Sequence, residues 1–113
     1  MEFLMGLDQY AFARFGDQKT EIAYWRKHAN LEGWMADLYR VKTGDEEVFN
    51  CKELVLDKHD IKMLEQDYKN LATAAGFFWG ESYPEDDATV AEFIVAARAL
   101  LESGHTIIYT SWW

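Results

Sequence analysis

The amino-acid sequence predicts an α+β fold in two layers, with three helices packed on a small, mainly antiparallel sheet. Strand-like segments lie at both ends of the chain and helical periodicity lies between them, without the βαβ alternation of a doubly wound sheet. Paired N- and C-terminal strands would each cover an edge of the other. Because the chain has 113 residues, 50% of them hydrophobic, and no linker or repeat, we expect one globular domain over residues 1–113.

The first predicted strand spans residues 6–15, where side chains alternate between two faces. One face carries Tyr10, Phe12 and Arg14, and the other carries Leu7, Gln9, Ala11 and Ala13. A turn at Gly16-Asp17 ends this strand.

The longest predicted helix spans residues 22–39 and is apolar around most of its circumference. Thr20 is its predicted N-cap, and the helix is expected to end near residues 40–42. Arg26 and Asn30 lie on its narrow polar arc. A helix of this kind is normally covered on more than one side, which predicts a central position in the domain.

The middle of the chain predicts a short strand followed by a one-sided helix. The β-branched and aromatic residues within 46–56 favour the strand. Asp57 is the predicted N-cap of the second helix, whose apolar residues recur at helical spacing until Gly76 closes it.

The last third of the chain predicts a third helix and a terminal strand. Thr89 opens a capping-box pattern, with Asp86 or Asp87 as alternative caps. The helix is expected to end at Ser103-Gly104, and residues 106–113 follow as a strand.

The composition narrows the function classes. A formal net charge of −9 disfavours direct nucleic-acid binding, because Lys and Arg bind phosphate backbones. One cysteine, Cys51, and three scattered histidines predict neither a disulfide nor a metal site, and no motif predicts a cofactor. The N-terminus lacks a targeting signal and no stretch reaches the ~18 apolar residues of a membrane span. We therefore expect no membrane association and a cytoplasmic location.

Candidate nucleophiles lack a catalytic setting. Ser111 has no Gly-x-Ser-x-Gly context, and the acidic neighbours of Cys51 disfavour a thiolate. No glycine pair is followed by the Lys-Ser or Lys-Thr of a phosphate-binding loop. We therefore assign no catalytic residue.

Two polar pairs are candidate binding residues. His28 and Glu32 lie four residues apart on one side of the predicted helix, where they could form a proton-transfer pair or half a metal site. The more usual interpretation is an intrahelical hydrogen bond. Arg26 and Asn30 could hold the carboxylate or phosphate of a small anionic ligand. Alternatively, Arg26 pairs with an acidic residue of this chain.

Aromatic residues make up 16% of the chain, and most are expected in the core. Trp79, Tyr83, Trp112 and Trp113 lie in a loop and at the C-terminus, where burial is least assured. Trp79 and Trp112 are the predicted partner-binding residues, because exposed Trp side chains are favoured anchors of protein interfaces. The alternative is a structural lid on the helices.

Five short motifs span nearly the whole chain: Met5-Gly6-Leu7-Asp8-Gln9-Tyr10, Tyr24-Trp25-Arg26-Lys27 with Trp34 downstream, Cys51-Lys52-Glu53, Gly76-Phe77-Phe78-Trp79-Gly80 and Tyr109-Thr110-Ser111-Trp112. In this order the chain resembles a family of small uncharacterised bacteriophage proteins. The resemblance implies a viral origin and an accessory role in the cytoplasm of an infected bacterial host. The chain departs from the family pattern at Trp79 and Thr110, where the family has Phe and Ser.

The sequence leaves three hypotheses. The first is a non-catalytic phage accessory protein that binds a host or phage protein. The second is a small-molecule or nucleotide-binding module that uses Arg26, Asn30 and a stacking aromatic. The third is an enzyme that uses His28 and Glu32. Exposed aromatics and a sheet edge also favour a homodimer.

Overall fold

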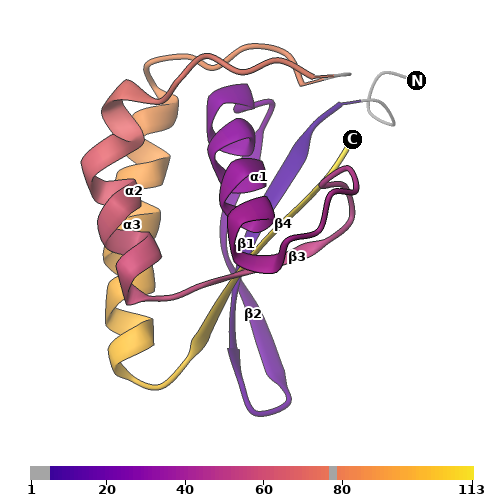
Figure 1. Ribbon diagram of the computed structural model, residues 1–113. Coiled ribbons are helices and arrows are strands. Elements are labelled where there is room, and N and C mark those ends of the chain that lie inside the picture. The colour runs from indigo at the N-terminus through magenta and orange to yellow at the C-terminus, as the bar shows by residue number, and fades with distance from the viewer. Residues whose placement is uncertain (1–5, 77–78) are drawn as a thin grey trace.

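A computed structural model describes residues 6–76 and 79–113 (Figure 1). Four strands form one sheet in the order β2-β1-β4-β3, and each neighbouring pair is antiparallel. They are β1 (Asp8–Phe15), β2 (Gln18–Arg26), β3 (Glu53–Leu56) and β4 (Thr106–Trp112). The N- and C-terminal strands pair at the centre of the sheet, as predicted. The motif residues Met5, Phe77 and Phe78 lie outside the described residues.

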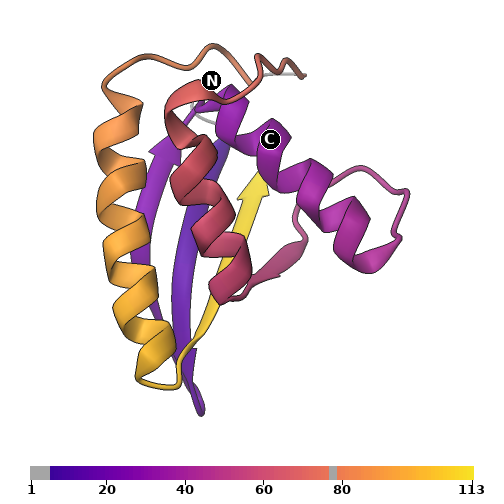
Figure 2. The same ribbon diagram turned by 60° about the vertical axis from the view of Figure 1, so that its left-hand side comes forward.

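Three α-helices lie on one face of the sheet. They are α1 (Ala29–Thr43), α2 (Lys58–Asp67), which continues as the 3-10 helix η2 (Tyr68–Asn70), and α3 (Asp86–Glu102). Figure 2 shows α2 and α3 side by side in front of the strands, with α1 diverging from α2. The predicted two-layer α+β fold is therefore confirmed. In the described part of the chain, no helix combines the length and the apolar character that crossing a bilayer requires.

The core lies between the helices and the inner face of the sheet. Gln9, Ala11 and Ala13 of β1 are buried on this face, as the alternation predicts. Trp25 of β2 packs edge-on against Phe93 of α3, with ring centroids 5.4 Å apart. Other buried apolar and aromatic side chains fill the rest of the core: Leu31, Met35, Phe49, Leu54, Leu56, Ile61, Leu64, Val90, Ile94, Ile107 and Tyr109.

The prediction of one helix over residues 22–39 is wrong at its N-terminal end. The segment through Arg26 is β2, and α1 begins only at Ala29, so Thr20 is a strand residue rather than an N-cap. At a β-bulge opposite β1, β2 contains one extra residue, Ile22. The bulge interrupts the two-residue alternation of a strand, and the remaining apolar positions then fit a helical period.

Three other boundaries differ from the prediction. The second helix ends at Asp67 and gives way to η2, rather than continuing to Gly76. The third helix begins at Asp86, so Thr89 lies inside it. The strand predicted within 46–56 is confined to β3, because Cys51 adopts a positive φ of 60° that interrupts extended backbone.

Among the predicted N-caps, Asp57 alone is confirmed, because Glu85 rather than Thr89, Asp86 or Asp87 is the N-cap of α3. Asp57 is the N-cap of α2: its carboxylate accepts the Asp60 backbone N–H at 2.9 Å, and the Asp60 carboxylate accepts the Asp57 N–H in return. Ser103 is the C-cap of α3, as predicted. Gly44, with φ 72°, closes α1, and this left-handed conformation favours glycine.

Candidate functional site

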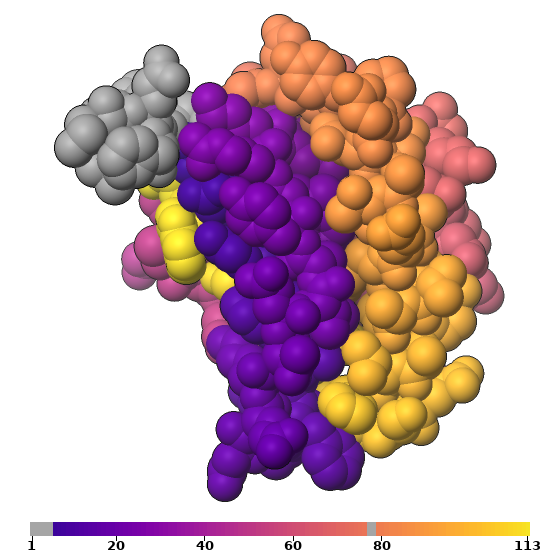
Figure 3. All heavy atoms as spheres, turned by 180° about the vertical axis from the view of Figure 1, so that it is seen from behind, coloured from indigo at the N-terminus to yellow at the C-terminus, as the bar shows by residue number. Residues whose placement is uncertain are grey.

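The outer face of the sheet, over which no described helix lies, carries a cluster of four aromatic side chains. Figure 3 shows the molecule from behind, where dark indigo atoms of the N-terminal strand lie beside yellow atoms of the C-terminal strand. Tyr10 of β1 is at its centre, with its ring centroid 5.2 Å from that of Tyr24 on β2 and 4.9 Å from that of Trp112 on β4. Phe12 follows along β1 at 6.1 Å. Tyr24 and Trp112 are 43% and 48% exposed. We call these four side chains the aromatic face.

An ion pair borders the aromatic face. The Asp8 carboxylate accepts hydrogen bonds from the Arg26 guanidinium at 2.8 Å and from the Tyr24 hydroxyl at 2.6 Å. Asp8 lies opposite Arg26 in β2 and opposite Trp112 in β4, so the three residues form one row across the strands. Asp8 raises the pKa of the Arg26 guanidinium, which stays charged. The predicted pairing of Arg26 with an acid of this chain is confirmed.

The strands carry balanced charge, unlike the chain as a whole. Three acidic and three basic residues lie in the four strands: Asp8, Glu21 and Glu53 against Arg14, Lys19 and Arg26. The net charge of −9 therefore comes from the helices, turns and loops. A partner that approaches the aromatic face meets no local excess of negative charge.

The inner face of the same strands holds a buried polar network. The Glu32 carboxylate of α1 accepts the Tyr109 hydroxyl at 2.6 Å and the Ser111 hydroxyl at 2.8 Å. The Tyr109 hydroxyl in turn accepts from the Gln9 amide at 2.9 Å. Burial raises the pKa of Glu32, although these two hydroxyls oppose the shift. Burial and the nearby Glu32 carboxylate raise the pKa of Tyr109.

The start of α1 is fixed by side chains that are distant in sequence. The Gln9 amide accepts the His28 backbone N–H at 2.8 Å and donates to the His28 carbonyl at 3.0 Å. The Ser82 hydroxyl oxygen accepts the Asn30 N–H at 2.9 Å and lies 2.6 Å from Nδ1 of His28. Ser82 thus binds a free N–H group in the first turn of α1, which His28 itself does not bind through its side chain.

His28 and Asn30 line a pocket of about 350 Å³, together with side chains from η2 and the loop before α3. Burial lowers the pKa of His28, and the acids Asp86 and Asp87 oppose this shift. Asp86 lies 4.0 Å from Nδ1, the same ring nitrogen that Ser82 approaches. A serine hydrolase places its Ser and Asp on different nitrogens of the His, so this arrangement is not a catalytic triad.

The predicted pair of His28 and Glu32 forms no side-chain hydrogen bond. Glu32 points to Tyr109 and Ser111, and His28 contacts Ser82. The intrahelical bond expected between the two side chains is therefore wrong, because His28 precedes α1 rather than lying within it. Among residues 6–76 and 79–113, no group of three or more His, Cys, Asp or Glu could hold a metal ion.

The other predicted site residues fall into two places. Arg26 and Trp112 come together at the aromatic face. Trp79 is half-buried and packs against Trp113, with ring centroids 5.6 Å apart. Because successive residues along a strand point to opposite faces, Trp113, which follows the outward-facing Trp112 of β4, lies with Trp79 on the helix side of the sheet. The lid interpretation fits Trp79 and Trp113, and Trp112 lies on the opposite side.

Asp8, Tyr10 and Tyr24 belong to the candidate site but were not predicted as site residues. The alternation of the first strand placed Tyr10 beside Phe12 on one face, which is the available signal for this surface. Tyr24 was assigned to the predicted helix over residues 22–39, so its place in a strand beside Tyr10 was missed. Its neighbours in the sheet become apparent only from the register of β1 and β2.

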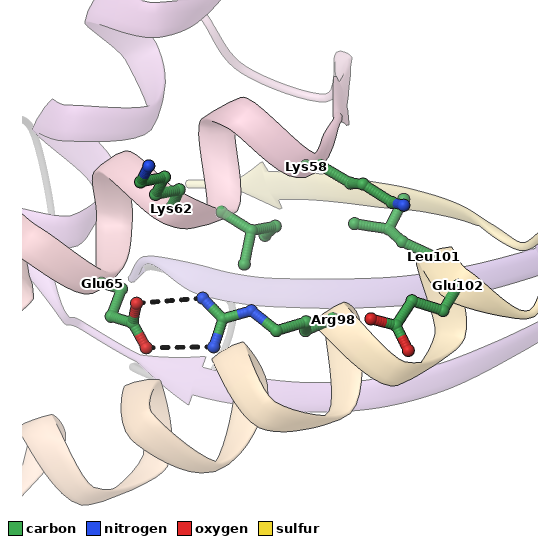
Figure 4. Close-up of a pocket in the computed structure, with 7 residues that line it drawn as sticks. Lys58, Lys62, Glu65, Arg98, Leu101 and Glu102 are labelled. Atoms are coloured by element: carbon green, nitrogen blue, oxygen red, sulfur yellow. Dashed lines mark hydrogen bonds and ion pairs between the residues drawn. The ribbon is translucent and has the colours of Figure 1, made fainter.

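A further pocket of about 280 Å³ lies between α2 and α3 (Figure 4). Both terminal nitrogens of the Arg98 guanidinium donate to Glu65 at 3.0 Å and link the two helices. Arg98 lowers the pKa of Glu65. Exposed pairs of this kind contribute little to stability, and the remaining charged lining side chains, Lys58, Lys62 and Glu102, extend to solvent.

The fold and the candidate site define an α+β protein in which helices cover one face of the sheet, while the described residues place no helix over the other, aromatic face. No protein-family model matches the chain, and no curated protein or solved structure is significantly similar to it.

Proposed function

We propose that this chain is a non-catalytic protein-binding module whose aromatic face contacts a host or phage protein. The observation that carries the proposal is that exposed Tyr24 and Trp112 flank Tyr10, with Arg26 beside them, on a sheet face over which no described helix lies. Trp, Tyr and Arg are the residue types most enriched at the energetic centres of protein interfaces. Tyr and Trp also lose little conformational entropy on binding, because each has only two side-chain torsions.

The neighbours of the aromatic face support a macromolecular partner. Asp8 holds Arg26 and the Tyr24 hydroxyl in place, so these polar groups are ordered before a partner arrives. Pre-ordered side chains reduce the entropy lost on association.

The resemblance to small bacteriophage proteins supports an accessory role in the cytoplasm of an infected bacterium. The partner would then be a bacterial protein or another phage protein. A second copy of the chain is the competing occupant of the aromatic face, because the balanced charge of the strands does not oppose a homodimer.

The second candidate function is binding of a small anionic molecule, and the pocket beside Asn30 favours it. Lys69 lines this pocket. The side-chain amide oxygen of Asn30, Oδ1, accepts the Ala74 backbone N–H at 3.0 Å. Arg26 pairs with Asp8 instead, so Lys69 rather than Arg26 would bind the anion. A nucleotide and metabolite panel that leaves the melting temperature unchanged would exclude this candidate.

The proposed function is tested by capture of partners from bacterial extract on immobilised protein, with Trp112→Ala and Tyr24→Ala as test variants. Phe15→Ala is the matched control, because Phe15 is an exposed aromatic of the same sheet and packs against His105 outside the aromatic face. We expect both test variants to lose a protein that wild type and Phe15→Ala retain. Equal capture by all folded variants would contradict the proposal, and size-exclusion chromatography of the same variants detects a homodimer.

A further inference from the structure

A groove of about 460 Å³ separates α1 from α2, on the helix layer of the molecule. Its apolar lining comes from Trp34, Leu38 and Val41 of α1 and from Met63 of α2. The three α1 residues follow a helical repeat and share one side of the helix. Val41 is 82% exposed and Met63 38% exposed. Figure 2 shows that α1 and α2 diverge.

The polar contacts of the groove exclude an extended partner strand. Lys42 donates to the backbone carbonyl of Val55 at 2.6 Å, and Val55 lies on β3, an edge strand of the sheet. This contact occupies an acceptor that a β-strand partner would need. A partner helix needs no such acceptor, because its backbone groups bond internally. Its side chains can instead fill a groove between two helices.

The rims of the groove are acidic. Asp37 of α1 and the N-cap Asp57 of α2 line it, and their side chains are 81% and 63% exposed. Lys42 lies 3.9 Å from Asp57, so the lining holds three carboxylates, those of Asp37, Asp57 and Asp60, against one lysine. Asp60, also in the lining, is buried and binds Lys42, which neutralises the lysine inside the groove. Arg40 approaches Asp37 at 3.2 Å, on the exposed surface. The carboxylates thus surround an apolar floor in a chain of net charge −9.

We propose that this groove binds an amphipathic basic helix of a partner protein. The apolar residues of that helix would enter between Leu38, Val41 and Met63, and its Lys or Arg residues would face Asp37 and Asp57. Methionine suits such a surface, because its flexible side chain adapts to different apolar shapes. The groove lies on the helix side, whereas the aromatic face lies on the other side of the sheet, so this proposal is independent of the proposed function.

The test is fluorescence anisotropy with a labelled synthetic helix of Leu and Lys, in which Leu recurs at helical spacing. Two control peptides accompany it: one with the same composition in scrambled order, and one with Glu in place of Lys. We expect saturable binding of the amphipathic Leu-Lys peptide. The scrambled peptide should bind at least about tenfold more weakly, and the Glu peptide should not bind.

Variants distinguish the groove from general charge attraction. Val41→Asn should weaken binding of the Leu-Lys peptide by about tenfold, because the substitution places an amide among the apolar side chains of the groove. Val95→Asn is the matched control, since Val95 is 69% exposed on α3 and does not line the groove. Asp37→Asn should also weaken binding and reduce its salt dependence.

Equal binding of the ordered and scrambled peptides, or equal effects of Val41→Asn and Val95→Asn, would overturn the proposal. Trp112→Ala should bind the Leu-Lys peptide as wild type does, because it changes only the aromatic face. If neither the wild type nor any variant binds the Leu-Lys peptide, the proposed helix-binding role of the groove is refuted. Partner capture by the aromatic face is a separate measurement and would be unaffected. Thermal melting of each variant confirms that the compared proteins are folded.

Discussion

The two faces of β1 differ in the size of their side chains. Its covered face presents a polar residue and two small ones, Gln9, Ala11 and Ala13, all buried. Its uncovered face presents Tyr10 and Phe12. Sheets with one face in water normally place apolar residues inside and polar residues outside. In this protein, the aromatic side chains of the outer face are not needed to fill the core.

The inner face of the sheet carries the contacts that stabilise the fold, and the outer face carries aromatic side chains that are accessible to a partner. On the inner face, Gln9 fixes the start of α1 through both backbone groups of His28, and Glu32 connects α1 to β4. Every one of these polar contacts is directed to a specific partner, which defines where α1 lies. On the outer face, Tyr24 and Trp112 remain accessible and make no contact that a helix of this chain requires.

The largest expected effect is on the inner face. Gln9→Ala removes three hydrogen bonds and leaves the buried His28 backbone N–H without its partner, whereas the His28 carbonyl keeps the Glu32 N–H at 3.1 Å. Because unsatisfied buried groups are costly, we expect the free energy of unfolding to fall by about 3 kcal/mol. Urea denaturation measures this change, with the exposed Gln18→Ala as control, expected within about 0.5 kcal/mol of wild type. Equal losses for the two variants would remove the contrast between the faces.

The second prediction concerns pH. Because burial raises the pKa of Glu32 in the folded protein, the native state binds its proton more tightly than the unfolded state does. The stabilisation from this group is therefore greatest below the ordinary Glu pKa and is lost as pH rises through the raised value. Relative to Glu32→Gln, wild type should gain stability as pH falls from neutral toward the ordinary Glu pKa of 4.5.

Chemical denaturation of wild type and Glu32→Gln at several pH values measures this difference. Subtracting the two profiles cancels the acids common to both proteins, such as Glu65, whose pKa is lowered by Arg98. A difference that is flat between neutral pH and 4.5 would show that Glu32 titrates normally in the folded protein.

On the outer face, Trp112→Ala should have a smaller effect on stability than Gln9→Ala. Its contact with Tyr10 is a cross-strand aromatic pair, and such pairs contribute up to about 1 kcal/mol. We expect a loss of about 1 kcal/mol or less in urea denaturation, together with loss of partner capture. A loss as large as that of Gln9→Ala would assign Trp112 to the fold rather than to recognition.

The smallest effect is expected for the ion pair beside the aromatic face. Asp8→Asn removes the charge that faces Arg26, and exposed pairs contribute up to about 1 kcal/mol. The difference in stability from wild type should shrink in 1 M salt, because screening weakens the wild-type pair. Stability measured at low and high salt tests this, and a difference that salt does not change would indicate that the hydrogen bonds dominate.

Local patterns in the sequence predicted much of the fold. The alternation of residues 6–15 predicted both faces of β1, and the N-cap Asp57 and the end of the third helix at Ser103 were correctly predicted, whereas the N-caps of the other two helices were not. The boundary between β2 and α1 was missed, because the bulge at Ile22 breaks the strand period and the positive φ of Lys27 leaves no clear signal in residue type. Local periodicity cannot separate two apolar elements that follow one another so closely.

The candidate site was predictable only in pieces. Arg26 and Trp112 were both selected from the sequence, but their proximity depends on the register of three strands, with Asp8 between them. Likewise, Glu32 bonds to Tyr109 and Ser111, which lie 77 and 79 residues away along the chain. Such contacts follow from the topology of the sheet and have no local signature.

Hydroxyl-radical footprinting of the captured complex tests the role of the aromatic face most directly. The protein is oxidised alone and with its captured partner, and mass spectrometry quantifies the labelling of each aromatic residue. We expect Tyr24 and Trp112 to be labelled in the free protein and protected in the complex, while the exposed Tyr83 keeps its labelling. Unchanged labelling of Tyr24 and Trp112 in the complex, with protection elsewhere, would contradict a binding role for the aromatic face.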